Sequence, residues 1–159
     1  MPLRTARADI RLITELLTLA EREALALGES APAAEHVLLA AVSLPDDSAA
    51  IALGHGADEV RAAIGAVHAQ SLASVGVAAP AGLDAPAAAP LLYGSTPTAR
   101  DVFQRARVLA KKSPTGLRTA HVLLAALDQR HGTVSRVLDH LGVDRASVAT
   151  RAEQALGAP

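Results

Sequence analysis

The chain has 159 residues, with 15 Lys and Arg against 16 Asp and Glu, which gives a formal net charge of −1 at pH 7. This length fits one domain or two very small, tightly packed ones, and a hydrophobic content of 50% argues against wholesale disorder. The missing basic excess disfavours a protein that mainly grips nucleic acid, and the absence of cysteine excludes disulfides and thiolate metal sites. Aromatic residues make up only 1%, so the core must consist of Leu, Val, Ile and Ala.

Apolar residues at helical spacing predict four helices in the first half of the chain. Their expected ranges are 10–27, 34–44, 48–53 and 58–74. Gly28 and Pro45 end the first two of these helices. We expect Ser48 to be the N-cap of the third.

The composition changes between the two halves of the chain. Residues 76–95 are rich in Ala, Pro and Gly, and Asp84 is the only charged residue among them. A helix cannot continue through Pro80, Pro86 and Pro90. This segment is therefore predicted to be an extended linker.

The second half repeats the plan of the first. The expected helices are 97–112, 119–127, 133–141 and 144–156. Thr96 is the expected N-cap of the first, with Pro97 in the first helical position. Thr119 and Asp144 are expected to cap the second and the last.

A repeated phrase supports this duplication: EHVLLAA at 35–41 returns as AHVLLAA at 120–126. We therefore predict an all-α fold of eight helices, arranged as two tandem four-helix repeats packed with pseudo-two-fold symmetry. Leu39 and Leu124 should then be equivalent core positions. His36 and His121 are interpreted as structural residues that cap or pack against a neighbouring loop, because neither has a second histidine four residues away to share a metal.

The two repeats resemble the Clp N-terminal repeat found at the front of Clp-type AAA+ unfoldases. The second repeat carries the family's motifs as TPTA at 96–99, TAHVLL at 119–124, GTVSRVL at 132–138 and LGVD at 141–144. The first is more divergent and carries EHVLL at 35–39, SAAIAL at 48–53 and GAD at 56–58. The resemblance places repeat 1 at residues 1–75 and repeat 2 at 96–159, together forming one compact domain.

The resemblance implies an unfoldase N-domain without the motor, since the chain has no phosphate-binding loop of the type GxxxxGK[ST]. In the family such domains bind adaptors, substrates or peptide-like ligands, and the Glu of the Thr-Glu-His motif can contact arginine-like ligands, including phosphoarginine. Glu35 matches this Glu in the first repeat, whereas Ala120 replaces it in the second. Ser95 stands where the family has a Phe that lines the groove for cyclic peptides. The candidate partner-binding residues are Glu35, Thr96 and Arg100.

The leading hypothesis is a non-catalytic protein-binding module that recognises adaptors or substrates, or that modulates a Clp ATPase or protease. The alternative is a relative that sequesters peptide antibiotics aimed at the unfoldase, and a DNA-binding regulator is the least favoured. We expect no enzyme activity, cofactor, metal or membrane contact. The charged first segment and the absence of cysteine predict a cytoplasmic protein.

Overall fold

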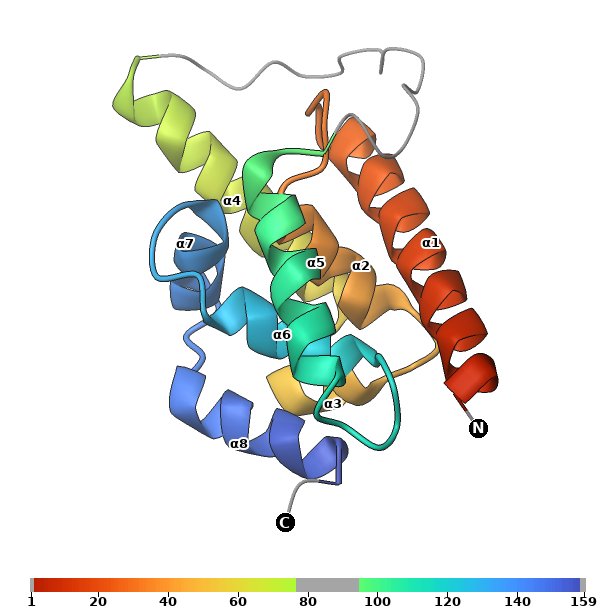
Figure 1. Cartoon of the computed structure of the whole chain (residues 1–159). Coiled ribbons are helices and arrows are strands. Elements are labelled where there is room, and N and C mark those ends of the chain that lie inside the picture. Colours follow the sequence, from red (N-terminus) through yellow and green to blue (C-terminus); the bar gives the residue numbers. More distant parts are fainter. Residues whose placement is uncertain (1, 77–94, 158–159) are drawn as a thin grey trace.

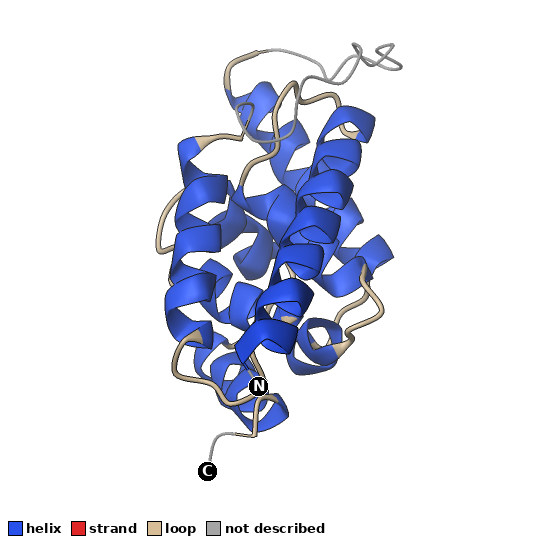
Figure 2. Cartoon of the chain, turned by 45° about the vertical axis from the view of Figure 1, so that its right-hand side comes forward, coloured by secondary structure: helices blue, strands red, loops and turns tan. Residues whose placement is uncertain are grey.

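The computed structural model describes residues 2–76 and 95–157, which form eight α-helices and no strand (Figures 1 and 2). The predicted linker lies almost wholly outside these residues. Within the described ranges, no helix combines the length and the apolar character that a bilayer crossing demands. The prediction of an all-α fold is confirmed.

The first unit contains α1 to α4, close to the ranges expected from the apolar spacing. Their bounds are α1 Pro2–Ala26, α2 Ala34–Ser43, α3 Ser48–Leu53 and α4 Ala57–Ser74. The prediction was wrong at the start of α1, which begins eight residues earlier than expected. Ile10 is 65% exposed, and the residues just before it bury too little to show a helical period.

The second unit contains α5 to α8, again close to expectation. Their bounds are α5 Pro97–Ala110, α6 Thr119–Leu127, α7 Thr133–His140 and α8 Arg145–Ala155. Two predicted N-caps are confirmed, since Thr96 Oγ1 accepts the N–H of Ala99 and the Asp144 carboxylate accepts the N–H of Ser147. The motifs of the second unit therefore mark real helix boundaries.

The two units interlock around a central pair of helices. Figure 1 shows α2 and α6 in the middle of the molecule, where α1 packs on α2 and α5 packs on α6. The remaining helices pair across the units, α3 with α8 and α4 with α7. This exchange is what a pseudo-two-fold arrangement of two similar units requires.

The core consists mainly of Leu, Val and Ala from all eight helices. In α2 every residue except Ser43 is buried, and in α6 every residue except Leu124. Small alanine side chains let these two helices lie close together without aromatic residues.

The expected caps of α3 and α6 were wrong, because Ser48 and Thr119 each cap the helix of the other unit. Ser48 Oγ accepts the N–H of Ala120 at 3.1 Å, and Thr119 Oγ1 accepts the N–H of Ala49 at 3.2 Å. The two hydroxyls also bond each other at 3.0 Å. Ser48 and Thr119 are each the first residue of their own helix. The side chain of each accepts a free backbone N–H at the start of the helix in the other unit.

The expected equivalence of Leu39 and Leu124 also fails. Leu39 is fully buried, whereas Leu124 is only partly buried and lines two hollows between α5, α6 and α8. In the first unit, Arg61 of α4 and Glu23 of α1 form an ion pair at 2.8 Å that bridges the corresponding outer helices. The two units thus share a backbone plan but differ in how their outer helices are joined.

Candidate functional site

The three candidate partner-binding residues lie at the junction where α2 and α5 begin. The N–H of Thr96 donates to the Pro32 carbonyl at 3.1 Å, and the N–H of Ala34 donates to Thr98 Oγ1 at 3.3 Å. These two bonds hold the starts of the helices side by side. Glu35, in the first turn of α2, therefore lies next to the first turn of α5.

Arg100 is exposed, but its guanidinium is held in place. Its Nε and Nη2 donate to the Ser95 carbonyl at 3.1 and 2.9 Å. Ser95 is itself buried. Because both bonds reach one backbone oxygen, the side chain is fixed over the start of α5 while remaining accessible to a partner.

Glu35 is much less accessible, at 6% exposed. Its Oε1 lies 3.4 Å from Nε2 of His68 on α4, and the other ring nitrogen of His68 lies 3.6 Å from Oε1 of Glu29. The sequence predicted a partner contact for Glu35, whereas the structure shows its carboxylate paired within the protein.

Burial and pairing set the ionisation of these groups. Burial alone would raise the pKa of Glu35, but hydrogen bonds from His68 and from its own backbone, together with the nearby histidine rings, lower that pKa. The hydrogen bond to Glu35 outweighs burial and raises the pKa of His68. The pair therefore favours a charged carboxylate and a charged imidazole.

His36 and His121 occupy matching positions in α2 and α6. His36 Nδ1 accepts the N–H of Ala33, and His121 Nδ1 accepts the N–H of Arg118, both at 3.0 Å. Each ring thus satisfies one free amide at the start of its helix, which leaves the hydrogen on Nε2. Burial lowers the pKa of both rings, so both are neutral near pH 7.

Sequence reasoning missed His68, the residue that organises this junction. Its ring lies 6.2 Å from that of His36, centroid to centroid, at an interplanar angle of 63°. On the same helix, Ser71 Oγ accepts a hydrogen bond from Arg136 of α7 at 2.9 Å. The available signal was the position of His68 four residues after the buried Ile64, on the inner face of α4.

The carboxylate and the imidazole beside the junction are paired with each other. Over residues 2–76 and 95–157, no group of three or more His, Asp or Glu side chains is placed to hold a metal ion. Glu35 and His68 are both occupied by each other, so neither is poised as a free base. What the junction offers is a fixed cation, Arg100, beside exposed Thr98.

One comparison with known proteins found a match. A family model described as the Clp repeat (R) N-terminal domain matches residues 95–159, a range that contains α5 to α8. No curated protein matches the chain.

Proposed function

We propose that the chain is a protein-binding module that acts on the Clp machinery, because residues 95–159 match the model of the Clp repeat N-terminal domain family. Its partner is a Clp-type ATPase, an adaptor or a protein substrate. The family match carries the proposal, because domains of this family are non-catalytic and generally mediate protein interactions. Residues 1–75 and 96–159 act as the two repeats of one compact domain.

The junction of α2 and α5 is the proposed contact surface. Arg100 offers a cation whose position is set by Ser95, so little side-chain freedom is lost when a partner carboxylate binds. Thr96 and Thr98 add hydroxyls at the same edge. Glu35 lies beneath this surface, where its carboxylate is paired with His68.

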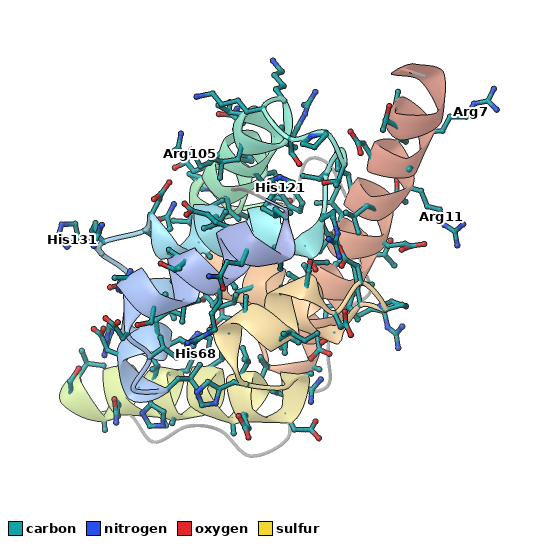
Figure 3. The ribbon with its side chains drawn as sticks, turned by 90° about the horizontal axis from the view of Figure 1, so that it is seen from below. Arg7, Arg11, His68, Arg105, His121 and His131 are labelled. Atoms are coloured by element: carbon teal, nitrogen blue, oxygen red, sulfur yellow. The ribbon has the colours of Figure 1, made fainter. Side chains whose placement is uncertain are left out.

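The test is direct binding between the immobilised chain and a purified Clp-type ATPase, with and without its adaptors and tagged substrates. Arg100→Glu should weaken binding at least about tenfold, because it reverses the charge at the contact. Arg7→Glu is the matched control, since Arg7 projects from the far end of α1 (Figure 3). If none of these proteins is captured and unfoldase-driven proteolysis does not change, the proposal is wrong.

A further inference from the structure

Two hollows lie side by side on the second unit, between α5 and α8. Their volumes are about 390 and 310 Å³. They share Leu109 of α5, Leu124 of α6 and Glu153 of α8. We call the two together the α5–α8 groove.

The groove exists because the second unit lacks polar side chains that the first unit uses. Glu23 of α1 and Leu109 of α5 are equivalent positions, because each precedes the last buried alanine of its helix. Arg61 of α4 and Ala149 of α8 are also equivalent, because each follows a buried valine. The Glu23–Arg61 ion pair that bridges α1 and α4 therefore has two apolar residues as its counterpart.

The same contrast holds at the other end of the groove. In the first unit Glu35 meets His68, which lies four residues after the buried Ile64. The matching positions in the second unit are Ala120 and Leu156. The floor that the two hollows share is therefore apolar and consists of Leu109 and Leu124. The smaller hollow is also lined by charged side chains, those of Arg105, Asp128, Arg130 and Arg145.

Two donors stand at the wider hollow. Lys112 lines it, and among the described residues its ammonium makes no hydrogen bond or ion pair. His121 also lines it, between α5 and α8 in Figure 3, with its Nε2–H left over after Nδ1 accepts from Arg118.

We propose that the α5–α8 groove docks a segment of a protein partner in which an apolar side chain stands next to an acidic one. The apolar side chain packs on Leu109, Leu124 and Leu156, and the carboxylate meets Lys112 and His121 Nε2–H. Glu153 on the α8 side repels a second carboxylate there and so fixes the direction of the segment. An apolar pocket with a few convergent polar groups is the usual form of such an anchor site.

This inference deepens the proposed function, because it assumes a protein partner and names a second contact surface. The probe is a fluorescent peptide with the centre Ser-Leu-Leu-Asp in a Gly/Ser frame, titrated with the full chain. We expect measurable binding that weakens at least about tenfold when Asp is replaced by Asn in the peptide, because the charge-assisted bonds are lost. A peptide with Lys in place of Asp should not bind.

Variants of the chain locate the site. Lys112→Glu should weaken binding of the Asp peptide at least about tenfold, whereas Lys111→Glu, a neighbouring lysine outside the groove, should leave it within about twofold. Amide shifts in the NMR spectrum should change at Leu109, Leu124 and Gly157, which also covers the case in which a variant misfolds.

Several results would overturn the inference: equal binding of Asp and Asn peptides, equal binding by Lys112→Glu and the unmodified chain, or shifts confined to other helices. Failure of the proposed function is separable. If a Clp-type ATPase is captured but the peptide does not bind, only the groove assignment fails. If the peptide binds at the groove but no Clp component is captured, the proposed function fails while the groove stands.

Discussion

His68 is held between two carboxylates, those of Glu29 and Glu35, and so ties α4 to the start of α2. The raised pKa of His68 means that its protonated form favours folding, an effect that is complete below the ordinary value of 6.5 and lost as the pH rises through the raised pKa. The lowered pKa of Glu35 has the opposite sign: its contribution is present above 4.5 and lost as the pH falls through the lowered pKa.

The two effects overlap in one pH window. We expect His68→Gln to lower stability most between pH 4.5 and 6.5, by about 1 kcal/mol, and less at pH 8. Chemical denaturation of both proteins across this range measures the difference. His131→Gln, at an exposed loop position, should leave the free energy of unfolding unchanged over the whole pH range. A loss that does not depend on pH would show that the pair contributes packing alone.

At the scale of elements, the exchanged caps join α3 and α6. Asp46 lies just before α3, and its carboxylate accepts the N–H of Thr119 at 2.8 Å and the Arg118 guanidinium at 3.0 Å. Burial would raise the pKa of Asp46, but these bonds and those from Ser48 lower it. One side chain of the first unit therefore stabilises the start of a helix in the second.

Asp46→Ala should cost about 2 kcal/mol of unfolding free energy, because it leaves the Thr119 amide without its acceptor. Asp47→Ala is the control: Asp47 occupies the N-cap position of α3 without making a side-chain cap bond, so we expect a loss of about 0.5 kcal/mol or less. The Asp46 contribution should disappear on acidification below its ordinary pKa of 3.8. Equal costs for the two variants would contradict the exchange of caps.

The two leucines of the repeated phrase give a second prediction at this scale. Leu39→Ala should cost about 3 kcal/mol, because it opens a cavity at a fully buried position. Leu124→Ala should cost about 1 kcal/mol, since its side chain already borders the α5–α8 groove. Urea unfolding of the two variants measures the difference, and similar losses would mean that the groove is closed in solution.

At the scale of the whole molecule, free backbone groups at the ends of α3 in the first unit are hydrogen-bonded by side chains of the second unit. α3 receives Thr119 at its start, and near its end the Ala52 carbonyl accepts Nε of Arg151 from α8 at 2.8 Å. The pairs α3–α8 and α4–α7 bury apolar surface only when both units are present. Folding is therefore expected to be one cooperative event.

A fragment of residues 95–159 should lack a cooperative thermal transition by circular dichroism, because the apolar surfaces of α6 and α8 that pack against the first unit would be exposed to water. Mixing it with a fragment of residues 1–76 should restore helicity and the transition. A cooperative melt of the isolated second fragment, near the temperature of the full chain, would show that the units are independent.

The sequence by itself determined the helices and the duplication. Apolar spacing, Gly and Pro stops, and the caps Thr96 and Asp144 are local properties, and they predicted the ends of α2 to α8 to within two residues. The repeated phrase made two related units predictable. These features depend on neighbours in the chain, which the sequence displays directly.

Tertiary structure alone decided which side chains meet. Two contacts join residues that are far apart in the chain: Ser48 with Thr119 between the two units, and Glu35 with His68. The partial exposure of Leu124 likewise depends on helices that are distant in the sequence. The two units have nearly the same helical pattern, so periodicity could not show that one closes its outer helices with an ion pair while the other leaves a groove. That outcome depends on the volumes and charges that face each other once the helices are packed.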